Sequence, residues 1–368
     1  MATIFYSLAG EGRGHATRVR TIVEHLRSEH RFVIFAPGDA YEMLAPLYAG
    51  SGVRVTRIPG LQFEYTARNT LSPWRTTRGV LGYLSRLPQL IARLQREIER
   101  ERPDLVLTDF EPALPRAAQR SGVPFVSLDH QHFLVASDLS RLPAPLRRRA
   151  ARMGALVGLY YRGQAATIVS SFCFPGLRPG MERALEVGPL LRPQVLEARA
   201  EHGAHLVVYV RKFGSERLIE ALAGTGREVR AYGWGAQPSR GKVRFFAIDE
   251  RRFVEDLATS YALITTAGNQ LLGEALYLGK PVFALPEPNN PEQLIHGHLL
   301  ANERTGEWLA FDEVSTPALE RFLDRVESYR SQIVRERLNG NAAVLAELRR
   351  HLTPKTQPRA AALQASLR

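Results

Sequence analysis

The sequence of 368 residues is poor in cysteine and in lysine. Cys173 is the single cysteine, so a disulfide within the chain is excluded and we expect a reducing compartment. Arginine supplies most of the 49 basic residues, because lysine occurs only at Lys212, Lys242, Lys280 and Lys355. The net charge of +12 admits nucleic acid, an anionic membrane surface or a phosphorylated small molecule as the partner.

Long apolar runs are also missing. No stretch approaches the ~20 apolar residues of a membrane-spanning helix, and the first residues, MATIFYSLAG, lack the basic start of a signal peptide. We therefore expect a cytoplasmic protein. Arginines 147–149 and Arg152 follow the segment LPAPL, which indicates either a solvated helix face or a basic patch that touches the inner face of an anionic membrane.

The remaining sequence alternates short apolar runs with helical patterns, which predicts an α/β fold of two doubly wound, parallel-sheet domains facing a cleft. We expect a Rossmann-like first domain over residues 1–186, a hinge over 187–200 and a Rossmann-like second domain over 201–335. A helix over 336–352 should return to the first domain, and 353–368 should form a disordered tail. Acceptor contacts are expected in the insertion between residues 60 and 102, which carries Phe63, Tyr65, Trp74 and Tyr83 among arginines.

The first strand ends in a glycine-rich turn, AGEGRGHATR over residues 9–18. Its glycines are spaced G-x-G-x-G, which is not the G-x-G-x-x-G of a dinucleotide site. His15 lies where a helix begins, and the positive end of the helix dipole there favours a neutral imidazole that can accept a proton. His15 is therefore a candidate general base, with packing or capping as the alternative. Gly12, Gly14 and Arg18 complete a predicted acceptor loop.

Carboxylates near this turn are candidate partners of the histidine. The fourth strand ends at Asp109, and the common strand order would place it beside the first strand, where it could orient His15. Asp109 could equally cap the next turn, and Glu11 is the rival base. Asp129, His130 and His132 form the segment DHQH, whose spacing matches no zinc site. We expect neither a metal nor a cofactor.

Residues 264–300 are arranged in the order that a nucleotide pocket requires. An apolar strand runs into Thr266, Ala267, Gly268 and Asn269, whose small side chains would let phosphate approach the amides of the next helix. Side chains on a helix lean toward its N-terminus, so Glu274 could reach the ribose.

A second helix begins after the following strand. Asn290 fits the N-cap and Pro291 the first helical position. Glu292 and Gln293 could then bind sugar hydroxyls, or Gln293 could close a capping box onto Asn290.

Three segments carry a family resemblance: LAGEGRGHATR, EVGPLLRP, and the stretch from FFAIDERRF through ITTAGNQLLGEALYLGKPVFALPEPNNPEQ. Together they resemble inverting glycosyltransferases of the GT-B fold. The nearest likeness is to bacterial and plant enzymes that glycosylate lipid intermediates or diacylglycerol, and to a prokaryotic group opening G-E-G-x-G-H-A-x-R. Two departures concern the sugar: Thr266-Ala267 replaces a second glycine or serine, and Glu292-Gln293 replaces Asp-Gln.

The resemblance implies that the nucleotide binds the second domain and the acceptor the first. It implies phosphate contacts at residues 266–269, ribose contact by Glu274, and sugar contacts by Glu292 and Gln293. His15 would match the general base. The nucleobase would bind around Phe246, Ala247 and Ile248, and the diphosphate would face Arg211, Lys212, Gly214 and Ser215.

The expected activity is metal-independent transfer of a sugar, with inversion, from a nucleoside-diphosphate sugar to an acceptor hydroxyl. UDP is favoured by the resemblance, and the acceptor could be a lipid or cell-envelope precursor. A nucleotide-sugar 2-epimerase on the same fold is one alternative. A basic nucleic-acid-binding protein is another, although the aromatic residues follow no recognisable nucleic-acid module and we expect no nucleic-acid partner.

Overall fold

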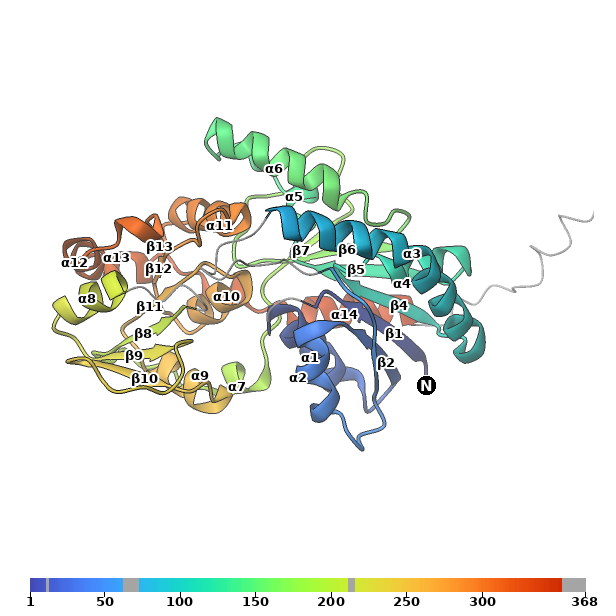
Figure 1. Cartoon of the computed structure of the whole chain (residues 1–368), viewed down its shortest axis with the longest axis horizontal. Helices are drawn as coiled ribbons and strands as arrows, with labels where there is room; N and C mark the ends of the chain where they lie inside the picture. The colour runs from blue at the N-terminus through green and yellow to red at the C-terminus, as the bar shows by residue number, and fades with distance from the viewer. Residues whose placement is uncertain (11–12, 62–72, 211–215, 353–368) are drawn as a thin grey trace, which may run out of the picture.

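The computed structural model describes residues 1–10, 13–61, 73–210 and 216–352, which fold around two parallel β-sheets (Figure 1). The seven-stranded sheet has the order β3-β2-β1-β4-β5-β6-β7 and the six-stranded sheet the order β10-β9-β8-β11-β12-β13. All their pairings are parallel. The prediction of two parallel-sheet α/β domains is therefore confirmed.

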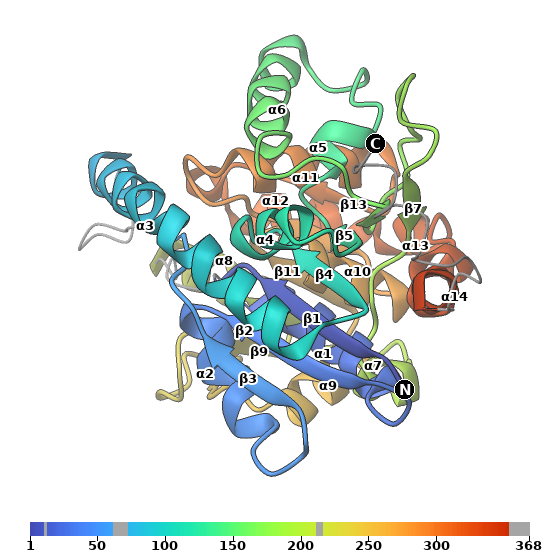
Figure 2. The ribbon, with the colours of Figure 1, turned by 90° about the vertical axis from the view of Figure 1, so that its right-hand side faces the viewer.

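The first sheet consists of β1 (Thr3–Leu8), β2 (Arg31–Ala36), β3 (Arg54–Arg57), β4 (Leu105–Asp109), β5 (Phe125–Asp129), β6 (Ala166–Ser170) and β7 (Leu185–Val187). Its central strands are mostly apolar and buried along almost their whole length, because helices cover both faces. Helices α1 (Arg13–Leu26), α2 (Gly38–Leu47) and α14 (Asn341–Leu352) share the core of one face, and α3 (Pro73–Glu101) and α4 (Ala113–Arg120) cover the other. Figure 2 shows the sheet between these two layers.

The second sheet consists of β8 (Leu206–Tyr209), β9 (Val229–Tyr232), β10 (Val243–Phe246), β11 (Ala262–Thr265), β12 (Val282–Ala284) and β13 (Gly306–Trp308). Helices α8 (Glu216–Gly224), α12 (Thr316–Asp324) and α13 (Val326–Arg330) pack on one face. On the other face lie α9 (Glu250–Ala258), α10 (Asn269–Tyr277) and α11 (Pro291–Asn302). This second core continues into α5 (Phe133–Ala136) and α6 (Ala144–Val157) of the first domain, so the two domains share buried apolar surface.

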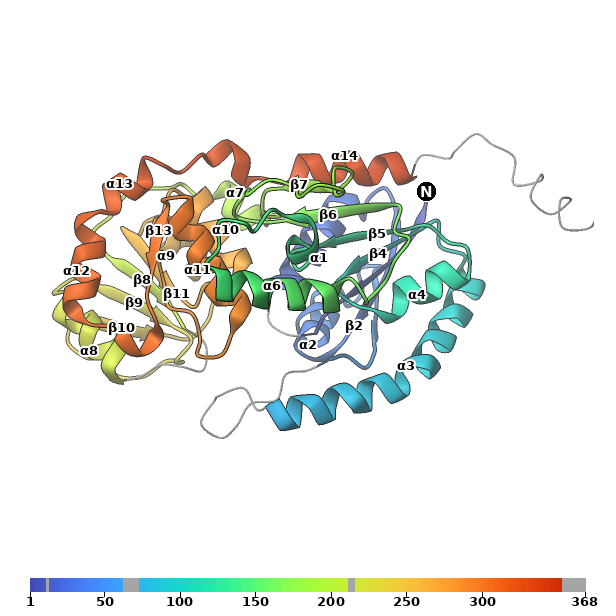
Figure 3. The ribbon, with the colours of Figure 1, turned by 90° about the horizontal axis from the view of Figure 1, so that it is seen from above.

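Two stretches of chain connect the domains. The first leaves β7 and leads to the short helix α7 (Pro193–Glu197), and the second returns through η2 (Arg335–Leu338) to α14, as Figure 3 shows. They touch closely, because a β-carbon on Gly188 would lie 2.4 Å from the carbonyl oxygen of Arg337. The Asn341 side chain also bonds both backbone groups of Leu191, at 2.9 and 2.8 Å. Movement at one connection therefore requires movement at the other.

Some elements differ from the sequence prediction. The three-residue strands β7 and β13 were not predicted, because so short a segment shows no periodicity. The helix predicted over 336–352 is divided into η2 and α14. Among the described residues, no helix combines the length and apolar character needed to cross a bilayer.

Candidate active site

His15 lies at the start of α1, at the carboxyl edge of the first sheet. Strands β1 and β4 are neighbours with Leu8 opposite Asp109, which brings the carboxylate to the same edge. The Nδ1 atom of His15 lies 2.7 Å from Oδ1 of Asp109. The strand order thus places Asp109 beside His15, as the sequence predicted. The imidazole keeps 12% of its side-chain surface exposed, whereas the carboxylate is fully buried.

Arg18 is the third member of this cluster. One helical turn after His15, it donates from Nε to Oδ2 of Asp109 at 2.9 Å and from Nη2 to Oδ1 at 2.8 Å. The guanidinium is buried, with 3% of the side chain exposed. Arg18 was predicted in the acceptor loop. In this structure its guanidinium instead balances the buried charge of Asp109, so it positions the carboxylate.

The hydrogen bonds indicate how His15 can act. Arg18 can only donate, and its Nη2 atom lies 2.9 Å from the same Nδ1 atom that Oδ1 of Asp109 approaches at 2.7 Å. The shorter contact with the carboxylate favours a proton on Nδ1. A neutral imidazole with that tautomer has its lone pair on Nε2, so the cluster can accept a proton from a bound hydroxyl.

The second domain presents the start of α10 to this cluster. Strand β11 leads into Ala267, which has a positive φ of 60°, and then Gly268, which is the helix N-cap. Gly268 is exposed, has a φ of −74°, and has no atom within 4 Å of a β-carbon built on it. Neither the backbone nor packing requires glycine here, so open access to the helix start is what this glycine provides.

The starts of α1 and α10 approach each other. A β-carbon on Gly14 would lie 3.6 Å from Cβ of Gln270. Asn269, predicted to contact phosphate, is instead buried between the domains, where its side chain accepts from the Phe172 amide and donates to the Ser170 carbonyl, both at 3.2 Å. Thr266 is also buried. Of the predicted phosphate turn, Gly268 is therefore the accessible residue.

Glu274, the predicted ribose ligand, is 2% exposed and already paired. Arg192 from the interdomain connection donates to both carboxylate oxygens, at 3.1 and 2.8 Å, and its Nη1 atom lies 2.5 Å from Glu250. Arg20 on α1 binds the same Glu250. A ribose hydroxyl could bind Glu274 only if Arg192 gave up at least one of its hydrogen bonds to the carboxylate. The sequence placed Arg192 in the hinge without indicating this ion-pair network.

The predicted nucleobase segment lies at the carboxyl end of β10. Ala247 and Ile248 are exposed, and Phe246 is partly buried beneath the guanidinium of Arg252, 3.9 Å from the ring centroid. Asp249 then caps α9 by accepting from the Arg252 amide. These exposed backbone groups stand at the same sheet edge as Gly268, where ligands of doubly wound sheets bind.

Gln293 and Glu292 lie in the first turn of α11. Asn290 is the N-cap, as predicted, and accepts from the Gln293 amide at 3.2 Å. The Gln293 side chain does not return to Asn290. Its Oε1 atom accepts from the Glu287 amide at 2.7 Å, so the capping-box alternative is wrong. Glu292 is partly exposed.

Asp129, His130 and His132 of the segment DHQH are buried, and the two histidines have different partners. His132 bonds the fully buried Asp129 at 2.7 Å, with Ser127 and Tyr161 completing the carboxylate's partners. Burial lowers the pKa of His132, but the Asp129 carboxylate outweighs it and the net shift is upward. His130 instead meets His296 of α11, with 2.7 Å between their Nε2 atoms. Burial lowers the pKa of both of these rings.

Several predicted site residues fall outside the described residues: Glu11, Gly12, Arg211, Lys212, Gly214, Ser215, Phe63 and Tyr65. The tail over 353–368 does so as well. The side chain of Trp74 is likewise not described, whereas Tyr83 is buried on α3 and donates to Glu111 at 3.2 Å. Tyr83 therefore supports the core of α3 and α4.

A family model described as glycosyl transferase family 1 matches residues 2–327. No curated protein sequence matches the chain. Among solved structures, the calicheamicin glycosyltransferase superposes with a TM-score of 0.68 at 18% identity, covering 97% of this chain and 100% of that one.

Two plant structures are similar. A UDP-glucosyltransferase from Polygonum tinctorium, described as capable of glucosylating indoxyl, gives a TM-score of 0.69 at 16% identity, over 96% of this chain and 99% of that one. A Phytolacca americana protein complexed with UDP-2-fluoro-glucose and pterostilbene gives 0.65 at 14% identity, over 94% and 98%. At such identities the likeness establishes the fold.

Proposed function

The chain belongs to glycosyl transferase family 1, and from that premise we propose that it moves a sugar from a UDP-sugar to an acceptor hydroxyl with inversion. The observation that carries the proposal is the His15–Asp109 pair, 2.7 Å apart, which lies where the starts of α1 and α10 meet. A candidate base from one domain thus stands next to a candidate phosphate site from the other.

In the proposed reaction, Nε2 of His15 takes the proton of the acceptor hydroxyl. The acceptor oxygen attacks the anomeric carbon from the face opposite the nucleotide, and the bond from that carbon to the diphosphate oxygen breaks. The bond electrons leave with UDP, and the proton stays on His15. Asp109 holds the imidazole in the required tautomer and stabilises the imidazolium that forms.

Charge that develops on the leaving diphosphate needs stabilisation. The amides at the start of α10 are suited to this task, with Gly268 leaving room for close approach. Glu274 is the single acidic residue between positions 262 and 286, and Arg192 occupies it. We therefore propose that no divalent cation bridges the diphosphate. Arg211 and Lys212, which the family resemblance assigns to the diphosphate and which lie outside the described residues, would share the work.

The remaining donor contacts are proposed from position and from the neighbours. Two solved structures of this fold are described with UDP or a UDP-sugar, which supports a uridine donor here. The exposed backbone at Ala247 and Ile248 suits the base. Glu292 suits the sugar, and the Gln293 side chain would have to turn from Glu287 to join it. Glu274 would bind ribose together with Arg192.

The Gly268→Ala variant tests the phosphate turn. We expect UDP affinity to fall at least about tenfold, because a β-carbon would stand where the diphosphate meets the amides, whereas stability should change by no more than about 1 kcal/mol. Calorimetric titration with UDP and thermal unfolding measure the two effects. Gly82→Ala on α3 is the matched control, because its β-carbon also meets open space. Equal UDP affinity in both variants would contradict the proposal that the diphosphate binds next to Gly268.

The reaction class is tested with labelled UDP-GlcNAc. Without acceptor, we expect the sugar to keep its configuration. With extracted membrane lipids added, label should move to a product with the anomeric configuration inverted. Formation of an epimer without acceptor would favour the 2-epimerase, which neither the family model nor the neighbours support. Salt-sensitive binding of random duplex DNA, without affinity for UDP-sugars, would instead favour the nucleic-acid alternative.

The exposed surface of α6 is consistent with an acceptor that lies in a membrane. Arginines 147–149 and Arg152 are exposed on it, and Leu156 and Leu159 follow with 63% and 59% exposure. Basic residues beside exposed leucines suit the surface of an anionic leaflet. We propose that this helix contacts the membrane peripherally while the acceptor enters the first domain.

Charge reversal tests the α6 contact. The Arg148→Glu/Arg149→Glu variant should bind vesicles containing anionic phosphatidylglycerol at least about tenfold more weakly, because each basic residue near such a surface contributes ~1 kcal/mol. Co-sedimentation with the vesicles measures this. Arg199→Glu/Arg251→Glu makes the same charge change at exposed positions off α6 and should leave binding closer to wild type. An equal loss of vesicle binding in both variants would mean that binding depends on the net charge of the protein and not on α6.

A further inference from the structure

His130 and His296 meet in the interior between the two domains. His130 follows β5 of the first domain, and His296 is on α11 of the second. Each ring contacts a backbone carbonyl through Nδ1: His130 reaches Ser170 at 3.0 Å and His296 reaches Ala267 at 2.8 Å. A carbonyl oxygen can only accept, so each Nδ1 carries a proton.

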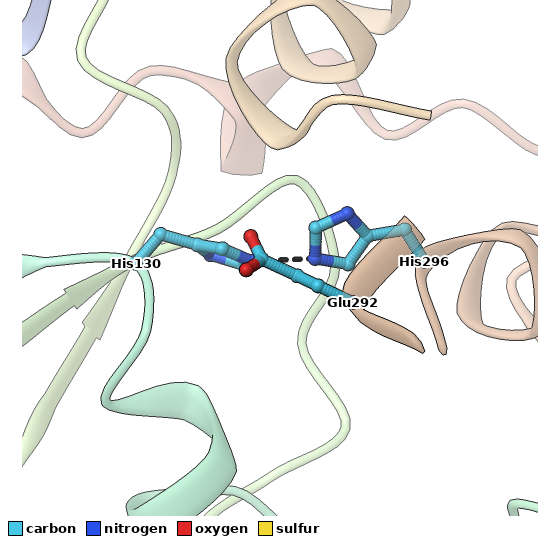
Figure 4. A group of neighbouring side chains, drawn as sticks. All are labelled: His130, Glu292 and His296. Carbon is cyan, nitrogen blue, oxygen red and sulfur yellow. Dashed lines mark hydrogen bonds between the residues drawn. The ribbon is translucent and has the colours of Figure 1, made fainter. Parts of the chain in front are cut away.

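These tautomers leave both Nε2 atoms unprotonated in the neutral rings. Yet the two Nε2 atoms lie only 2.7 Å apart, so their lone pairs would repel each other. A cation bound between the two nitrogens would remove this repulsion. The Glu292 carboxylate supplies the complementary negative charge, because one of its oxygens and one ring nitrogen from each histidine all lie within 4.8 Å of one another. Figure 4 shows the carboxylate beside the contact between the rings.

We propose that His130, Glu292 and His296 bind a divalent transition-metal ion, with zinc as the best match. Two imidazole nitrogens and one carboxylate oxygen form a ligand set that zinc accepts, and a fourth position stays open. At metal–nitrogen distances near 2.0–2.1 Å, tetrahedral geometry needs the Nε2 atoms about 3.3 Å apart, so the rings must separate by a few tenths of an ångström.

The backbone carbonyls behave as outer partners of such a site. A metal-binding histidine ordinarily donates its other N–H to a carbonyl or carboxylate, which fixes its orientation, and both rings already do this. Glu292 and His296 are four residues apart on α11 and so share one face of the helix. The three side chains converge without any change of secondary structure.

The site would join the domains and support the phosphate turn. Its ligands come from both domains, so a bound ion would hold them together. His296 also holds the carbonyl of Ala267, the residue of positive φ just before Gly268. A bound metal would therefore support the start of α10 through His296. Glu292 is also the proposed sugar contact, so donor and metal share one carboxylate.

Metal binding is tested on the full chain, purified without a histidine tag or chelator. Elemental analysis should find about one equivalent of zinc per chain. After chelation, Co²⁺ should restore one equivalent with the absorption bands of tetrahedral cobalt, and Zn²⁺ in excess should raise Tm by about 3 °C or more. The His296→Gln variant should lose affinity at least about tenfold. His298→Gln, two residues along α11 with its ring against Trp308, is the matched control and should bind normally.

Glu292→Gln provides a second variant if His296→Gln does not fold, because Glu292 is only partly buried. It should also weaken binding at least about tenfold. A wild-type chain that holds no metal, and whose Tm does not respond to Zn²⁺ or Co²⁺, would overturn the proposal in favour of a proton shared between the rings. Unchanged affinity in His296→Gln or Glu292→Gln would also overturn it. These measurements need neither donor nor acceptor, so they are independent of the proposed transfer.

Discussion

Replacing His15 with alanine is expected to lower turnover by about 10²–10⁴-fold, the usual contribution of a general base. The imidazole alone in this cluster can both accept a proton and reach solvent, because Asp109 and Arg18 are buried and bound to each other. The fold should survive, since His15 lies in the first turn of α1 and is partly exposed. UDP affinity should change little, because the proposed nucleotide site lies in the other domain.

Steady-state kinetics with a UDP-sugar and an active acceptor measure this effect. The loss should appear in kcat and in kcat/KM alike. His25→Ala is the control on the same helix, where the ring bonds the Thr21 carbonyl. A His15→Ala variant that retains wild-type turnover would remove the proposed base.

Replacing Asp109 with alanine is expected to cost about 3–5 kcal/mol of stability, because it leaves the Arg18 guanidinium buried without its counter-charge. Combining it with Arg18→Met should recover much of that loss, since the two charges then leave together. Activity should stay low in both variants, because nothing then orients His15. This loss of unfolding free energy is much larger than the loss expected when an exposed ion pair of the chain is removed.

Denaturant unfolding of the two single variants and the double variant measures the coupling between Asp109 and Arg18. Asp104→Asn serves as the control at the other end of β4, where an exposed carboxylate accepts from the Thr3 amide at 2.8 Å. That change should cost no more than about 1 kcal/mol. Equal losses for Asp109→Ala and Asp104→Asn would mean that Arg18 does not depend on its partner.

The sequence predicted the fold because its signals are local and repeated. Each central strand is a short apolar run, and buried parallel strands must be such runs. The meeting of His15 with Asp109 was predictable because doubly wound sheets share a strand order. The N-cap at Asn290 followed from local chemistry in the same way.

The contacts that the sequence did not reveal join residues far apart in the chain. Arginine is so abundant that no pattern selects Arg192 as the partner of Glu274, or Arg18 as that of Asp109. The spacing within DHQH excluded a local metal site, yet His130 meets a histidine 166 positions away once the domains pack. The sequence does place Glu292 and His296 four residues apart on one helix. That spacing alone does not predict a metal site, because it does not identify His130 as the third ligand.

A thermal-shift screen of the wild-type chain against nucleoside diphosphates and their sugars tests the central claim most directly. The account predicts that UDP and at least one UDP-sugar stabilise the protein, by about 2.7 kcal/mol at 100 times the dissociation constant, while random duplex DNA does not. No response to any nucleotide or nucleotide sugar, with stabilisation by DNA instead, would contradict a donor site at the start of α10.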